Sequence, residues 1–134
     1  MALSIIGNGT LSGENVTNSL NLQVNGQGFS PTLTLTDAAT INWDTDSGQV
    51  AKVTLAGNRT VAAPTNLEDG AFYSIQVTQD GTGSRTLSFN AVYEFKDDTA
   101  PTLTTTASYG DLFTFRYNGT KWLEIGRNLN LVLS

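Results

Sequence analysis

Apolar residues at alternate positions constrain this chain more than any other feature of its sequence. The pattern recurs in short stretches, among them 20–25, 32–36, 52–55, 73–78, 86–89, 113–117, 122–125 and 129–133. A repeat of two places the apolar side chains on one face of a β-strand. No stretch keeps the 3.6-residue repeat of an amphipathic helix for long, so the sequence predicts an all-β fold.

Glycine-containing turn signals separate these stretches. Asp80-Gly81 and Asn118-Gly119 supply the positive φ angles that tight hairpin turns need. About eight short strands joined by such turns predict an antiparallel β-sandwich, similar to a jelly roll. In this interpretation, 80–84 is the turn of a hairpin between strands 73–78 and 86–89. The sequence shows no internal repeat with a period of 20–50 residues.

The amino-acid composition excludes several classes of function. The chain has no histidine and no cysteine, so it cannot build a catalytic device that needs an imidazole or a thiolate. Its net charge is −5 and its seven Lys and Arg residues are scattered, which argues against a nucleic-acid partner. We find neither a membrane span nor a signal peptide, and we expect synthesis in the cytoplasm.

The segment Gly81-Thr82-Gly83-Ser84-Arg85 resembles a phosphate-binding loop at first sight. Such loops carry a lysine after the second glycine and stand between a strand and a helix. Here the lysine is missing and a strand follows, so no helix amino terminus could hold an anion. We therefore interpret the segment as a turn and Arg85 as a surface or interface cation.

The remaining candidates for chemistry have simpler structural interpretations. Asp44 begins a stretch that is similar to a calcium loop, but the ligand spacing fails, which favours a polar turn. Asp97 and Asp98 would point to opposite faces of a strand, and Asp111 is expected to cap a turn. Trp43 and Trp122 could stack on a sugar, although single aromatic residues on strands more often fill a core. We predict no catalytic residue, no metal ligand and no cofactor.

The first part of the chain differs from the rest. Residues 1–38 have small apolar clusters separated by Asn, Gly and Ser, and we interpret them as an extended amino-terminal arm with the first strands. Residues 39–134 would form the β-sandwich module. The arm could add a strand to a partner, and its candidate partner-binding residues are Leu3, Ile5, Ile6, Leu20, Leu22 and Val24.

One succession of segments is more specific than any single motif. It runs through Ala39–Asp44, Val53–Thr60, Asn66–Gly70, Tyr73–Asp80, Gly81–Leu87, Thr99–Leu103, Asp111–Phe113 and Asn118–Trp122. In order and spacing this succession resembles a β-rich module of tailed-bacteriophage virion proteins, found in tail fibres, spikes and head-surface proteins. The resemblance implies a non-enzymatic structural role on the surface of a virus particle, often as a homotrimer.

Three functions are compatible with that resemblance and with the residues. Because 1–38 alone precede the module, we expect a capsid decoration, or cement, protein that binds the major capsid protein or other virion proteins as a homotrimer. The first alternative is a tail fibre, tailspike or receptor-binding module for host attachment. The second alternative is a carbohydrate-binding domain that uses Trp43 or Trp122 to bind a host surface glycan.

Overall fold

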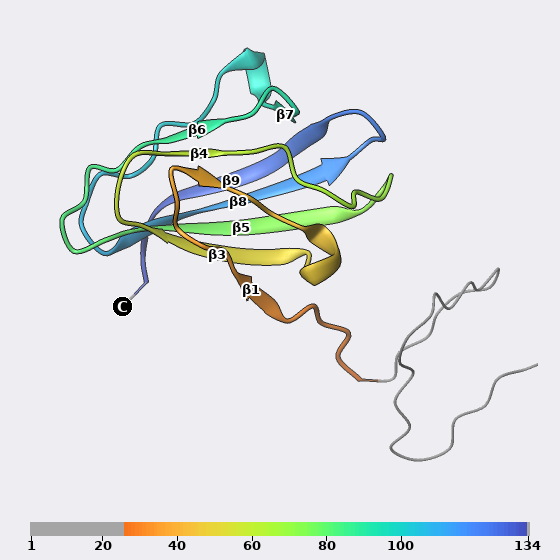
Figure 1. Cartoon of the computed structure of the whole chain (residues 1–134), viewed down its shortest axis with the longest axis horizontal. Coiled ribbons are helices and arrows are strands. Elements are labelled where there is room, and N and C mark those ends of the chain that lie inside the picture. The colour runs from red at the N-terminus through yellow and green to blue at the C-terminus, as the bar shows by residue number, and fades with distance from the viewer. Residues whose placement is uncertain (1–25, 134) are drawn as a thin grey trace, which may run out of the picture.

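The computed structural model describes residues 26–133, and it confirms the prediction of an all-β fold (Figure 1). The described strands are β1 (Thr32–Thr34), β2 (Thr40–Ile41), β3 (Val50–Leu55), β4 (Arg59–Val61), β5 (Phe72–Gln79), β6 (Leu87–Phe89), β7 (Tyr93–Glu94), β8 (Tyr109–Tyr117) and β9 (Trp122–Val132). Two single-turn 3₁₀ helices, η1 (Thr45–Ser47) and η2 (Lys96–Asp98), lie between strands.

The described strands form two sheets that face each other. The larger sheet has the order β1-β3-β5-β8-β9-β7, and the smaller one has the order β2-β4-β6. Strands β5, β8 and β9 pair antiparallel, as expected. The pairs β1–β3, β3–β5, β2–β4, β4–β6 and β7–β9 are parallel, which differs from the antiparallel sandwich that the turn signals predicted.

The parallel pairs arise because the chain winds in coils. Each coil has one strand in the larger sheet followed by one strand in the smaller sheet: β1 and β2, then β3 and β4, then β5 and β6. Successive coils stack in register, so that Leu33 pairs with Ala51 and Ala51 with Ile75. The fold therefore contains a structural repeat of three coils, although the side chains do not repeat closely enough to reveal it in the sequence.

The predicted strand faces agree with the observed burial in the middle of the larger sheet. In β5 the side chains of Tyr73, Ile75 and Val77 are buried, and those between them are partly exposed. Phe113 and Phe115 in β8 are fully buried on the same face. These residues cover one side of a core whose other side is formed by the smaller sheet, including Ile41 and Val61.

Aromatic side chains fill one end of this core. The ring of Tyr73 stacks on that of Trp122 with centroids 4.4 Å apart, and the ring of Trp43 meets Trp122 edge-on at 5.1 Å. Tyr93 and Phe115 also contact Trp122. Both tryptophans are therefore core residues, which confirms the interpretation that the sequence favoured and leaves no tryptophan of the described residues free to stack on a sugar.

The last strand, β9, departs from the predicted alternation. The sequence predicted that Leu123 and Ile125 share the apolar face, with Trp122 opposite. The structure instead buries Trp122 and leaves Ile125 54% exposed. The pairing with β8 explains the difference: Trp122 lies opposite Tyr117 and Glu124 opposite Phe115, so both are on the core face and Leu123 is on the other. A β-bulge follows, because Thr114 pairs with Gly126, and it leaves Ile125 as an extra residue outside the ladder.

Replacement of Trp122 by alanine should destabilise the fold strongly, because it leaves a large cavity among four aromatic rings. We expect a loss of about 3–5 kcal/mol in the free energy of unfolding, measured by urea denaturation. Phe72→Ala is the matched control: Phe72 is 58% exposed, and its loss should change stability by less than about 0.5 kcal/mol. Equal losses in the two variants would contradict this description of the core.

Candidate functional site

The glycine-containing segment after β5 forms an arch between the two sheets. We call the segments that link the sheets within each coil the first arch (35–39), the second arch (56–58) and the third arch (80–86). The prediction of a hairpin at 80–84 is wrong, because β5 pairs with β3 and β8 whereas β6 pairs with β4. A turn signal indicates where the chain reverses, but it does not determine which strand becomes the partner.

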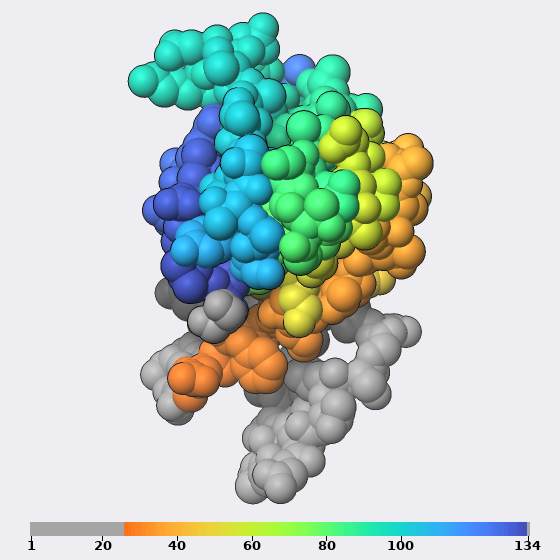
Figure 2. Space-filling view, turned by 90° about the vertical axis from the view of Figure 1, so that its left-hand side faces the viewer, coloured from red at the N-terminus to blue at the C-terminus, as the bar shows by residue number. Residues whose placement is uncertain are grey.

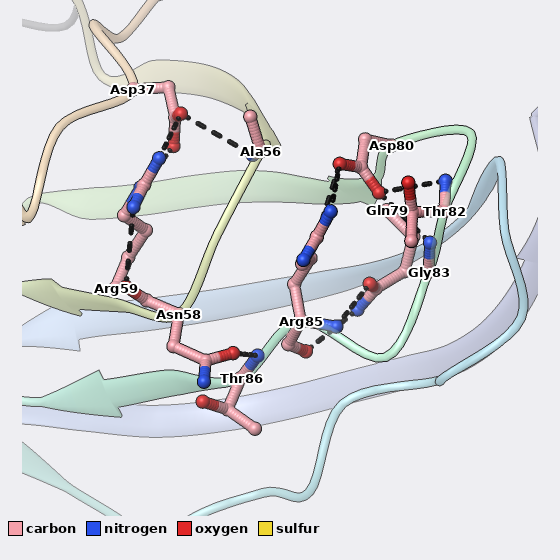
Figure 3. Close-up of polar contacts among 10 residues, drawn as sticks. All are labelled: Asp37, Ala56, Asn58, Arg59, Gln79, Asp80, Thr82, Gly83, Arg85 and Thr86. Carbon is pink, nitrogen blue, oxygen red and sulfur yellow. Dashed lines mark hydrogen bonds and ion pairs between the residues drawn. The ribbon is translucent and has the colours of Figure 1, made fainter.

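The carboxylate of Asp80 organises the third arch (Figure 3). Its Oδ1 accepts hydrogen bonds from the backbone N–H groups of Thr82, at 3.0 Å, and of Gly83, at 2.9 Å. Its Oδ2 accepts from Nε and Nη2 of Arg85, at 3.1 and 2.8 Å. The donors that a phosphate would need are thus already paired with a carboxylate of the chain itself.

The side-chain amide of Gln79 connects the start of the same arch to its end through two hydrogen bonds. Its Nε2 donates to the carbonyl of Arg85 at 3.0 Å, and its Oε1 accepts from the N–H of Arg85 at 2.8 Å. Gln79 is a polar residue at the end of β5 and is only 2% exposed, so these two bonds satisfy an amide that would otherwise be buried without partners.

Further polar contacts tie the three arches to one another. Asp37 of the first arch binds Nε and Nη2 of Arg59, at the start of β4, at 2.7 and 2.6 Å, and it also accepts from the N–H of Ala56. Asn58 of the second arch accepts a hydrogen bond from the N–H of Thr86 in the third. We refer to Asp37, Asn58, Arg59, Gln79, Asp80 and Arg85 as the arch network.

The charges of this network stabilise each other. Arg85, followed by the backbone N–H of Gly83, lowers the pKa of the Asp80 carboxyl from 3.8 to about 2. Arg59 lowers the pKa of Asp37, and Asp37 in turn raises the pKa of Arg59. Each carboxylate is engaged by a neighbouring guanidinium, so the network holds the arches together.

Two of the other candidate carboxylates, those of Asp44 and Asp111, are also engaged within the chain. Asp44 accepts from the N–H of Asp46 and from the side-chain amide of Asn66, as expected of a polar turn. Asp111 was expected to cap a turn, but it lies within β8 and is buried. Its carboxylate accepts from Thr104, through both its N–H and its hydroxyl, and from the N–H of Asn130.

The predicted partner-binding residues Leu3, Ile5, Ile6, Leu20, Leu22 and Val24 lie outside the described residues, and their role stays a prediction. Conversely, sequence analysis missed the roles of Asp37, Asn58 and Gln79. Their partners lie between 6 and 28 positions away along the chain, so no short motif could reveal them.

Asp97 and Asp98 do not lie on a strand, where the sequence analysis had considered them. They belong to η2, and both have left-handed φ angles, of 55° and 52°.

The fold is a β-module of three coils with the antiparallel strands β8 and β9, and four of its charged side chains, Asp37, Arg59, Asp80 and Arg85, hold the arches. Residues 36–122 match the family model described as "Putative phage tail fibre C-terminal domain". The match covers more than half of the 134 residues, and the chain belongs to this family. The resemblance to a phage virion surface module is thereby confirmed. Comparisons with curated proteins and with solved structures found no match.

Valine in place of Gly83 should distort the third arch. Gly83 has a φ of 76°, and a Cβ there would lie 2.5 Å from the carbonyl oxygen of Thr105 and 2.8 Å from the N–H nitrogen of Ala107. We expect Gly83→Val to cost at least about 1–3 kcal/mol of stability in urea denaturation. Gly81→Ala is the control, since a Cβ at Gly81 meets nothing within 4 Å; a similar loss there would argue against the arch geometry.

The Asp80–Arg85 pair should be visible in a titration. Because the pKa of Asp80 is lowered, its contribution to stability is present above pH 3.8 and is lost as the pH falls to about 2. Titration by NMR of the Asp80 carboxyl carbon should therefore show a midpoint of about 2. In Arg85→Met the midpoint should rise toward 3.8, and an unchanged midpoint would show that Arg85 is not the cause.

Proposed function

We propose that this chain is a non-enzymatic structural module of a phage tail fibre, assembled as a homotrimer and used in attachment to the host. The observation that carries the proposal is the family match over residues 36–122. It supports the tail-fibre alternative better than the capsid decoration protein that we first expected. The tail-fibre module and the decoration protein are both phage structural proteins.

Three features of the residues support a role without catalysis. The chain contains no histidine and no cysteine. The carboxylates of Asp37, Asp80 and Asp111 are all engaged in bonds that hold the fold. Within residues 26–133, no group of three or more acidic side chains is arranged to hold a metal ion. Such a module acts through its surface, and its partners would be other virion proteins, further copies of itself and a host surface glycan.

The described part of the chain also holds no helix with the length and apolar character needed to cross a membrane.

Electron microscopy of virions labelled with a gold-conjugated antibody against this chain tests the location. We expect labels on the tail fibres. Labels on the head would instead support the decoration protein and would overturn the tail-fibre proposal. As a functional control, purified protein should compete with virions for adsorption to host cells if the module takes part in attachment.

A further inference from the structure

Strand β9 presents apolar side chains that the core does not use. Ile125 is 54% exposed, Leu129 41% and Val132 64%. We call these three residues the β9 apolar surface. They come from one strand, whereas Leu133, which is also exposed, lies against Gly110 of β8, and Phe29 and Phe72 lie elsewhere in the chain. In Figure 2 the carboxy-terminal strands, in the darkest blue, form the left-hand margin of the molecule.

The same strand has a free backbone edge. On one side β9 pairs with β8 over most of its length, whereas on its other side β7 pairs only with Trp122 and Leu123. Within the described residues, 124–132 therefore have no strand on that side. A long exposed edge with apolar side chains and without lysine or proline is a site for association with another chain.

The opposite edge of the larger sheet does not have these properties. It is formed by β1, which has three residues, Thr32, Leu33 and Thr34, and follows Pro31. A short polar edge next to a proline is the kind of edge that natural sheets use to avoid association. The two edges therefore differ in kind, and β9 is the one suited to an interface.

The charge distribution indicates that the occupant is another copy of this chain. Each copy carries a net charge of −5, so two copies repel each other except where their surfaces are neutral. From Ile125 to Leu133 the only charged residue is Arg127. Its Nε and Nη2 bind the two carboxylate oxygens of Glu124, both at 2.6 Å, and its guanidinium lies 5.8 Å from the centre of the Phe95 ring. The pair is neutral, and Lys96, which lines the same groove as Ile125, lies 3.8 Å from the carboxylate of Asp97, so repulsion between copies is weak here.

We propose that the β9 apolar surface is the interface through which copies of this chain associate, with β9 running along the symmetry axis. This inference rests on the proposed homotrimer and names the surface that would form it. Around a symmetry axis the same side chains of each copy meet, so Ile125, Leu129 and Val132 would pack against their own counterparts. Residues 124–132 span about 30 Å at roughly 3.3 Å per residue, which gives a contact along much of the module.

Sedimentation velocity of the full chain over a range of concentrations tests the proposal. We expect the wild type to associate, and the double variant Leu129→Lys/Val132→Lys to associate at least about tenfold more weakly, because lysines on the axis would repel each other and lose hydration. The matched control is Phe72→Lys, which replaces an equally exposed aromatic residue on β5 and should associate like the wild type. Circular dichroism confirms that each variant is folded.

Hydrogen exchange of the backbone amides of 124–132 provides the second measurement. We expect protection in the assembled protein and its loss in the monomeric double variant. Two results would overturn the β9 interface without contradicting the homotrimer. In one, the double variant associates as strongly as the wild type; in the other, Phe72→Lys weakens association as much as the double variant does. A wild type that is monomeric at every concentration would overturn both. Strong protection of 124–132 in the monomer would assign the surface to another segment of the same chain and would also overturn the proposal.

Discussion

The contact of Trp43, Tyr73 and Trp122 is the interaction on which the rest of the fold depends. The three rings come from the segment after β2, from β5 and from the start of β9, so they connect these three parts of the described chain. Within the described residues, the indole N–H of Trp122 is buried without a hydrogen-bond partner, which costs about 1–3 kcal/mol. Packing against its aromatic neighbours outweighs this cost, and it anchors β9 to the coils.

The aromatic contact holds one end of the core, and the polar contacts of the arch network stabilise the arches that link the two sheets. A parallel strand pair cannot be joined by a tight hairpin, so each strand must leave its sheet, cross to the other sheet and return. Each crossing exposes backbone groups that no ladder satisfies. The arch network supplies the missing partners: Asp80 binds the N–H groups of its own arch, Asp37 reaches the second arch, and Asn58 reaches the third. The ion pairs with Arg59 and Arg85 hold these carboxylates in position.

Much of the local structure could be predicted from the sequence, whereas the pairing of the strands could not. Alternation at Tyr73, Ile75 and Val77 predicted both a strand and its buried face, because side-chain direction depends on adjacent residues alone. Whether β5 pairs with β6 or with β3 depends on contacts more than 20 residues apart, and an Asp-Gly turn fits a hairpin as well as an arch. The same limit applies to the candidate site: Asp80 and Arg85 stood in a visible motif, but Asp37 could be linked to Arg59 only in three dimensions.

The disagreement at β9 has a different origin from the others. In the other described strands the predicted apolar face is buried or partly buried, and the structure corrects which strands are neighbours. In β9 a bulge opposite Thr114 and Phe115 of β8 removes Ile125 from the ladder. Leu129 and Val132 also remain exposed, although their apolar character predicts burial. An isolated module gains nothing from three such side chains in water beside a free edge. If copies of the module associate through β9, these side chains are buried between the copies and form an apolar contact outside the core of the single chain.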